Sequence, residues 1–358
     1  MTEHPYKSVP PRGFWARSVA TSFDEAAVPD SPPFRLDRSD RFMSAGSCFA
    51  ANVRRYLESA GLSYVVTERT HPAFALGKPD MYYDAFSARY GNIYTARQMT
   101  QLLERALGLF APEEDHWVVG ERWVDPYRPG LRHPASSERE LRLLTQQHLA
   151  AVRAAVEQAT VLVFTLGLTE AWLSAADGAV FPACPGTVNG EFDPAKHGFH
   201  NFTVAEVTED LRRMVERARE INPASKVILT VSPVPLVATA TGRHVLTATT
   251  YSKSVLRVAA DVAASELEDV VYFPAYELVT GPQAPYEAYL DDRRNVSEAA
   301  VAGVMSAFFT TFFGEDLVTA GQEPTATPAE EEERRLQELQ ATVAEAMAVE
   351  CEEEMAGR

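Results

Sequence analysis

The sequence predicts an α/β protein in which a five-stranded parallel sheet is covered by helices on both faces. Two observations predict this fold class. Five short segments are apolar throughout rather than at alternate positions, as in strands that are buried on both faces. Segments with the 3.6-residue period of a helix separate them, and this alternation is typical of parallel sheets. The predicted strands are residues 41–45, 62–66, 161–165, 226–231 and 270–273.

The predicted helices carry their own start and stop signals. The first covers residues 52–58, and Gly61 ends it just before the second strand. Thr95 can cap a helix over 95–107, in which apolar residues recur every three or four positions. The same period predicts further helices at residues 138–159, 203–221, 249–267 and 297–313.

The sequence divides into three parts. Residues 1–40 contain six prolines and little apolar periodicity, so we expect an irregular N-terminal arm. Residues 41–315 form the α/β domain, and residues 110–134 read as an excursion or hairpin outside its sheet. Residues 316–358 are a linker and an acidic amphipathic helix. We expect the helix over 329–358 to dock on its own domain, on a second copy or on a partner; the alternative is a solvated helix.

Composition excludes several classes of function. A net charge of −17 argues against nucleic acid or an anionic membrane as a partner. Three cysteines are too few and too scattered for a disulfide framework or a structural zinc site. The sequence shows no signal-peptide pattern, no run of about 18 apolar residues, no glycine-rich phosphate loop and no metal-ligand spacing. We expect a cytoplasmic protein without cofactor or metal.

The segment Gly46-Ser47-Cys48-Phe49-Ala50 lies between the first predicted strand and the first helix. A tight turn between a strand and a helix is a setting in which enzymes of several folds present a nucleophile. The start of a helix favours a thiolate, so Cys48 there would have a lowered pKa. The alternative is that Cys48 is a small buried residue that packs behind the strand.

The ends of the predicted strands should bring polar residues together. Ligands of parallel sheets bind at the carboxyl ends of the strands. The segments at 46–48, 166–170, 232–236 and 274–281 should therefore meet at one edge of the sheet. A nucleophile, oxyanion donors, a histidine and carboxylates are the groups that acyl transfer needs. Candidates for these roles in the segments and loops concerned are Ser47, Cys48, Gly91, Asn92, Gly167, Thr169, Glu170, His200 and Asp292.

Several spaced blocks of the sequence together resemble the GSCFA-domain family, over roughly residues 40 to 313. Gly46-Ser47-Cys48-Phe49-Ala50 matches the signature that names this family. The further blocks are Gly91-Asn92-Ile93-Tyr94-Thr95, residues 165–172, Ser232-Pro233-Val234-Pro235-Leu236, residues 251–256 and Tyr272-Phe273-Pro274. The family is similar to the SGNH hydrolase superfamily of esterases, lipases and carbohydrate acyltransferases. That resemblance implies a flavodoxin-like three-layer α/β/α sandwich.

The resemblance also implies roles for individual residues. In the superfamily, a Gly-Asp-Ser block after the first strand supplies the nucleophile. When Gly46-Ser47-Cys48 is aligned with that block, Cys48 occupies the nucleophile position and Ser47 precedes it. The glycine and asparagine that donate to the oxyanion in that superfamily have their nearest equivalents in Gly91-Asn92 and in Gly167-Leu168-Thr169.

One departure concerns the general base. The superfamily ends with an Asp-x-x-His block, whereas this chain has Asp292-Arg293-Arg294-Asn295. Asparagine cannot take a proton from a thiol, so another residue must act as the base or the hydrolase chemistry has been lost. We expect His200 to be the substitute, with His244 second, and Asp292 or Asn295 to orient groups or bind substrate.

Two functions remain open on the sequence. The first is a cysteine-dependent acyltransferase or esterase that forms a thioester on Cys48 and moves an acyl group to or from a small-molecule or carbohydrate acceptor. The alternative is a catalytically degenerate SGNH-fold protein that binds a ligand without turnover. Cys48 favours the first and Asn295 the second. Lys253 is expected to be solvated, and Cys184 to be a bystander in a turn.

Overall fold

The structure is a computed structural model. It describes residues 4–69, 86–131, 133–284 and 287–318, without the side chains of Cys48 and Phe49. The predicted helix over 329–358 and most of the linker before it lie outside the described residues. Within these ranges, none of the helices has both the length and the apolar character that crossing a bilayer requires.

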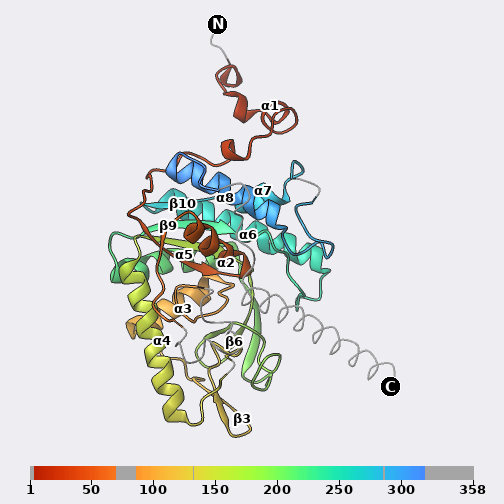
Figure 1. The fold of residues 1–358 in the computed structure, drawn as a ribbon. Coiled ribbons are helices and arrows are strands. Elements are labelled where there is room, and N and C mark those ends of the chain that lie inside the picture. Colours follow the sequence, from red (N-terminus) through yellow and green to blue (C-terminus); the bar gives the residue numbers. More distant parts are fainter. Residues whose placement is uncertain (1–3, 70–85, 132, 285–286, 319–358) are drawn as a thin grey trace, which may run out of the picture.

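A five-stranded parallel sheet forms the centre of the fold (Figure 1). Its strands are β1 (Arg41–Gly46), β2 (Ser63–Tyr64), β5 (Val161–Leu166), β9 (Lys226–Val231) and β10 (Val270–Tyr272). Their spatial order is β10-β9-β5-β1-β2, and every neighbouring pair is parallel. Counted along the chain this is the 2-1-3-4-5 order of flavodoxin-like sheets. The predicted fold class is confirmed.

The sheet is buried on both faces because successive side chains point to opposite sides. Met43 and Phe164 belong to one apolar core, and Phe42 and Val163 belong to the other. All four are at most 2% exposed. This explains why the strands are apolar throughout instead of at alternate positions.

Helices cover both faces of the sheet and make it a three-layer sandwich. Core residues of α3 (Ala96–Leu107), α4 (Glu138–Gln158), α5 (Val204–Ile221) and α6 (Val245–Glu266) pack on one face. The other face is covered by α7 (Ala275–Thr280), by α8 (Glu298–Phe313) and by most of the core residues of α2 (Cys48–Ser59). The apolar faces of these helices thus bury both sides of the sheet.

Four of these helices begin at a serine or threonine whose side chain accepts a hydrogen bond from the third helical residue. This N-cap satisfies one of the amides that a helix start leaves without a partner. The capping residues are Thr95, Ser137, Thr203 and Ser297. The predicted cap at Thr95 is therefore present.

Two small antiparallel sheets lie outside the main sheet. The first pairs β3 (Trp117–Val119) with β4 (Arg122–Val124), within the stretch 110–134. The second has the order β7-β6-β8 and comprises β6 (Glu170–Ser174), β7 (Val180–Phe181) and β8 (His197–Asn201). Side chains of both sheets share a separate apolar cluster. The second sheet was not predicted from the sequence.

The N-terminal arm consists of short helical turns and irregular chain, as Figure 1 shows at the N-terminal end. Its turns are η1 (Pro5–Lys7), η2 (Pro11–Gly13), α1 (Trp15–Ser18) and η3 (Glu25–Ala27). The end of the arm is fixed to α8, where the Leu36 N–H donates to the Phe312 carbonyl over 3.0 Å. The arm therefore approaches the sheet on the face that α8 covers.

Three predicted elements differ most from the observed ones at their boundaries. Helix α2 covers Cys48–Ser59, so it begins four residues before the predicted start at residue 52. The predicted strand at 62–66 is reduced to β2 at Ser63–Tyr64, although the Val65 N–H still donates to the Phe42 carbonyl over 2.8 Å. Helix α6 begins at Val245, four residues before the predicted start, because the His244 side chain accepts from the Leu246 N–H and caps it. Histidine is not among the preferred capping residues, so this helix start could not be predicted from residue type.

Candidate active site

The turn after β1 requires a glycine. Gly46 has a φ of +146°, a conformation that L side chains rarely adopt. A Cβ at this position would lie 2.5 Å from the Thr165 carbonyl oxygen of neighbouring β5 and 2.8 Å from the Thr165 Cβ. The Ile93 N–H donates to the Gly46 carbonyl over 2.8 Å and holds the turn. The tight turn brings the start of α2 to the carboxyl end of the sheet.

Ser47 and Cys48 lie at this edge, where α2 begins. Ser47 is the N-cap and Cys48 is the first helical residue. Unlike the four caps above, the Ser47 side chain makes no capping hydrogen bond. The residue is 6% exposed, and its buried Oγ has no hydrogen-bond partner. An unsatisfied buried hydroxyl costs about 1–3 kcal/mol, and this one belongs to a residue that lines the cavity described below.

The loop before α3 forms the next part of the site. The Tyr94 carbonyl accepts hydrogen bonds from the N–H groups of Gly167 (3.0 Å) and Leu168 (3.1 Å). The Gly167 amide, predicted as an oxyanion donor, therefore has a partner within the fold. Gly167 lies so close to Tyr94 that an added Cβ would be 3.1 Å from the Tyr94 carbonyl oxygen. The glycine thus allows two loops to meet.

Gln98 organises the same loop from the first turn of α3. Its Oε1 accepts from the Tyr94 N–H and its Nε2 donates to the Asn92 carbonyl, both over 2.9 Å. Gly91, at a φ of +65°, starts this loop. Neither Gly91 nor Asn92 lines the cavity described below. In this structure, the predicted Gly91-Asn92 pair belongs to the loop that supports the cavity wall.

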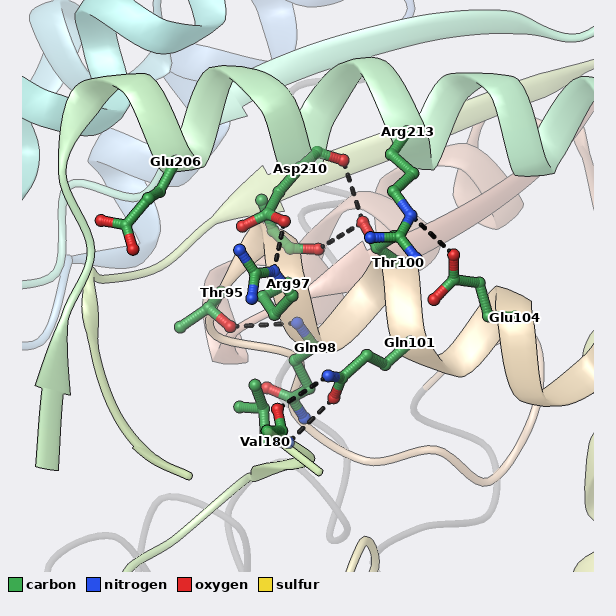
Figure 2. Close-up of polar contacts among 12 residues, drawn as sticks. Thr95, Arg97, Gln98, Thr100, Gln101, Glu104, Val180, Glu206, Asp210 and Arg213 are labelled. Carbon is green, nitrogen blue, oxygen red and sulfur yellow. Dashed lines mark hydrogen bonds and ion pairs between the residues drawn. The ribbon is translucent and has the colours of Figure 1, made fainter. Parts of the chain in front are cut away.

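A polar network between α3 and α5 holds the start of α3 in place, as Figure 2 shows. Arg97 pairs with Asp210, and the Thr100 Oγ1 donates to the Asp210 carbonyl over 2.9 Å. Arg213 pairs with Glu104 over 2.8 Å. Burial raises the pKa of Asp210, and the contact with Arg97 opposes that shift. Two helices far apart in the sequence thereby fix the loop that contacts Gly167.

The same helix fixes the small second sheet. The Gln101 side chain donates to the Gly178 carbonyl over 2.9 Å and accepts from the Val180 N–H over 2.8 Å (Figure 2). Val180 begins β7, and the residues after β7 form part of the cavity wall. Thus α3 positions two sides of the cavity.

Two more predicted residues follow β5. Thr169 is fully buried and does not line the cavity. Its N–H donates to the Ser252 Oγ over 2.9 Å, and its hydroxyl donates to Asn201 Oδ1 over 2.6 Å. Glu170 lines the cavity and accepts from the Thr239 hydroxyl (2.7 Å) and the Ala240 N–H (3.1 Å). Both residues connect the start of β6 to other segments.

Lys253 is buried, contrary to the expectation that it is solvated. It is 1% exposed, and its Nζ donates to the Gly167 carbonyl over 2.6 Å. A buried ammonium group needs such partners because burial without them is costly. The Gly167 peptide is therefore held from two sides, by Lys253 at its carbonyl and by Tyr94 at its amide.

A cavity of about 280 Å³ opens at this edge of the sheet. It lies where the direction of the strand order reverses, between β1 and β5, which is where ligands bind in such sheets. Polar groups on its lining come from the ends of β1 and β9, from α3, from the start of β6 and from the loop before α8. Apolar residues of β6 and β7 and of the segment after β9 supply an apolar wall. The lining includes Ser47, Gln98, Gly167, Glu170, Trp172, Phe181, Cys184, Ser232, Leu236 and Arg294.

The predicted histidines are placed elsewhere. The His200 Nε2 lies 2.8 Å from Glu206 Oε1, and Glu206 in turn completes the capping box at the start of α5. His244 caps α6. In the described part of the chain, no histidine lines the cavity. The structure therefore does not bring His200 or His244 together with Ser47.

Asp292 and Asn295 are bound to each other. The Asn295 Nδ2 donates to Asp292 Oδ2 over 2.5 Å, and the N–H groups of Arg294 and Asn295 both donate to Asp292 Oδ1 over 2.9 Å. Partial burial opposes the shift, but these hydrogen bonds lower the pKa of the Asp292 carboxyl. Neither side chain lines the cavity; the turn that they form instead places Arg294 against it.

Polar cavity residues that were not among the candidates from the sequence include Gln98, Cys184, Ser232 and Arg294, although Ser232 lies in the segment 232–236 that was expected at this edge. Cys184 was expected to be a bystander, yet it is a half-buried part of the lining, and burial raises its pKa to about 11. Ser232 directly follows the predicted strand at 226–231, so its position was a usable signal. Arg294 lies within the Asp-x-x-Asn stretch itself.

The described residues include no group of three or more histidine, cysteine, aspartate or glutamate side chains that could hold a metal ion. The polar groups at the cavity are hydroxyls, an amide, a carboxylate, a thiol and a guanidinium. Groups of these kinds can form hydrogen bonds and ion pairs with an organic ligand.

The fold is that of an α/β protein with a flavodoxin-like sheet and a cavity at its switch point. The sequence model of the GSCFA family matches residues 41–308, from β1 into α8. The chain belongs to the GSCFA family, as its sequence blocks indicated.

Other comparisons add little. A comparison with curated proteins gives no match. Among solved structures, the chain is similar to one described as "Clostridium thermocellum family 3 carbohydrate esterase". That similarity covers 76% of this chain and 94% of the esterase, at 11% identity and a TM-score of 0.32.

Proposed function

We propose that the protein is a cysteine-dependent acyltransferase or esterase with Cys48 as its nucleophile. The observation that carries the proposal is the placement of Cys48 as the first residue of α2, next to Ser47 and a cavity at the switch point of the sheet. The resemblance of the GSCFA blocks to the SGNH superfamily supports the same assignment. A cytoplasmic setting, also proposed, would keep the thiol reduced.

The start of α2 favours the ionised thiol. The N-terminus of a helix carries a partial positive charge, and thiols there have lowered pKa values. A cysteine needs less help from a base than a serine does, because part of it is thiolate near neutral pH. The proposed mechanism therefore works without His200, which is bound to Glu206.

The proposed reaction has two steps. The Cys48 thiolate attacks the carbonyl carbon of the acyl donor, a bond from sulfur to carbon forms, and the donor's leaving group departs with the bonding electrons. A proton from solvent or from the acceptor neutralises the leaving group. An alcohol, an amine or water then attacks the thioester carbonyl, and the thiolate is regenerated as the acceptor's proton is released.

Ser47 is proposed to stabilise the oxyanion of each step. Its hydroxyl is buried, has no partner in the fold and lies one residue before Cys48. A donor that is already in place, and that loses no internal hydrogen bond on reaction, suits this task. The Gly167 amide is less suited because it donates to the Tyr94 carbonyl.

The cavity favours a small acyl group. Its volume of about 280 Å³ is near the lower end of the range for ligand sites, which is roughly 300–1,000 Å³. Trp172, Phe181 and Leu236 supply an apolar wall against which a short acyl chain can pack. Small-molecule donors and acceptors are therefore the proposed partners.

A second candidate function is ligand binding without turnover. It is favoured by the Asp292–Asn295 contact, because the position that holds histidine in the resembled superfamily here holds an amide that is bound to its neighbour. Under this alternative the cavity binds the same class of molecule, but Cys48 never carries an acyl group.

Acylation of the intact protein separates the two candidates. The protein is incubated with an acyl-thioester or with p-nitrophenyl acetate, and its mass is measured after fragmentation to locate the adduct. The proposal predicts a single acyl group on Cys48, lost in Cys48→Ala and retained in Cys184→Ala. Folding of both variants is checked by circular dichroism. Equal acylation of Cys48→Ala and the unaltered protein would contradict the enzyme proposal.

A further inference from the structure

We infer that the ligand of the cavity carries an oxyanion group, either a carboxylate or a phosphate, and that Arg294 binds it. This inference deepens the proposed function, because it names the class of acyl donor or acceptor that the site would take. The role of the anion in acyl transfer rests on the proposed function, whereas binding of the anion is inferred from the geometry of Arg294 and the cavity alone.

Arg294 presents a charged donor that the fold leaves without a partner. Its Nε is buried and has no hydrogen-bond partner, and among the described residues no ion pair joins its guanidinium to a carboxylate. A buried donor without a partner is rare in folded proteins and costs more when it is charged. Because Arg294 lines the cavity, a ligand there can supply the missing acceptor.

The neighbouring carboxylates are already engaged. Asp292, two residues away, accepts hydrogen bonds from the N–H groups of Arg294 and Asn295 and from the Asn295 side chain. Glu170, which also lines the cavity, accepts from Thr239 and Ala240. Neither forms a hydrogen bond or an ion pair with the Arg294 guanidinium, although the charge of Arg294 contributes to the lowered pKa of Asp292. The chain therefore keeps an arginine available at a cavity although its net charge is −17.

A second, independent observation is the hydroxyl of Ser47. It is 6% exposed, lines the same cavity and also has no partner. Two unsatisfied donors at one small cavity, one of them cationic, call for a ligand rich in oxygen acceptors. Hydrogen bonds between a guanidinium and a carboxylate or phosphate are about twice as strong as neutral ones.

The ligand that these observations favour is a small molecule with two functional parts. One part is the acyl carbonyl, which would lie near Ser47 and the start of α2. The other is the anionic group at Arg294, and the apolar wall contacts the carbons between them. A long lipid chain or a neutral sugar ester would leave the arginine unsatisfied.

The test measures binding in the full-length Cys48→Ala protein, so that it does not depend on acyl transfer. The probes are succinate, inorganic phosphate and uncharged succinamide, with binding read by isothermal titration calorimetry. We expect succinate or phosphate to bind and succinamide to bind at least about tenfold more weakly, which equals about 1.4 kcal/mol. The two anions distinguish a carboxylate from a phosphate ligand.

Arg294→Gln should weaken binding of the favoured anion by about 10- to 100-fold, the loss expected for a charged hydrogen bond. Arg294→Lys should retain part of the affinity because it keeps the charge. Arg243→Gln is the matched control, since Arg243 is exposed, lies in the loop before α6 and does not line the cavity. It removes the same charge and should leave affinity within about twofold.

The inference is overturned if neither anion binds, if succinamide binds as tightly as succinate, or if Arg294→Gln and Arg243→Gln have equal affinity. Should Arg294→Gln fail to fold, Arg294→Lys and the comparison with succinamide still decide the question. Anion binding together with a Cys48 that never acylates would reject the proposed enzyme and retain the anion site.

Discussion

Replacing Gly46 with alanine should destabilise the protein and disturb the site together. Gly46 ends β1 and has a φ of +146°. An added Cβ would lie 2.5 Å from the Thr165 carbonyl oxygen, which belongs to the backbone of the paired strand and cannot rotate away. To relieve this contact β1 or the start of α2 must move, and Ser47 and Cys48 move with it.

The size of the effect follows from two contributions. A side chain in a backbone region that is nearly restricted to glycine costs on the order of 1–3 kcal/mol. Overpacking in a well-packed core adds about 1–3 kcal/mol. Gly46→Ala should therefore lower the free energy of unfolding by about 2–6 kcal/mol.

Gly108→Ala is the matched control. Gly108 ends α3 with a φ of +74°, and a Cβ there would meet nothing within 4 Å. Only backbone strain remains, which costs about 1–2 kcal/mol. Urea unfolding gives both free energies, and iodoacetamide labelling of Cys48 reports the site. A Gly46→Ala protein that is no less stable than Gly108→Ala, and that labels at the same rate as the unaltered protein, would refute the reasoning.

Two further predictions concern histidines outside the cavity. Burial and nearby Arg128 lower the pKa of His148 to about 4, although its contact with Glu68 opposes the shift. The contribution of His148 to stability is therefore complete above pH 6.5 and falls by on the order of 3 kcal/mol as the pH drops from 6.5 to 4. The free energy of unfolding, measured at pH 7 and at about pH 4.5, should show this loss, and most of the loss should be absent in His148→Gln. An equal change in the free energy of unfolding between the two pH values in both proteins would contradict the role of His148. His200→Ala should change Cys48 labelling by less than about threefold, whereas a general base would cost about 10²–10⁴ in rate.

The main sheet could be predicted because its signal is local. The long strands are mainly apolar at successive positions, which is typical of strands in a parallel sheet covered on both faces. The turn at Gly46 was equally readable, because a glycine between a strand and a helix commonly marks a tight turn. Thr95 and Gly61 also marked helix boundaries as expected.

The site could be predicted only in part because its contacts join distant segments. Nothing near Gly167 in the sequence indicates that its amide donates to the Tyr94 carbonyl, since the contact depends on how α3 packs against α5. The strand β8 containing His200 is short and pairs with β6 across more than twenty residues of chain. Its histidine was therefore expected at the cavity, whereas the small sheet directs it to Glu206.

Arg294 was missed for a different reason. In the sequence, the missing histidine at Asn295 and the carboxylate of Asp292 were the chemically prominent features of this stretch. The structure shows these two bound to each other and the residue between them placed against the cavity. Which member of a turn faces a cavity depends on the turn's geometry, and residue type alone does not determine it.

The central claim is that Cys48 is an activated nucleophile, and residue-resolved alkylation across a pH series tests it most directly. Cys184 provides an internal reference, because burial raises its pKa to about 11. We expect Cys48 to react with iodoacetamide along a titration curve whose midpoint lies below the ordinary thiol value of about 8.5, and Cys184 to react appreciably only at far higher pH. A Cys48 midpoint at or above about 8.5 in the folded protein would contradict the claim.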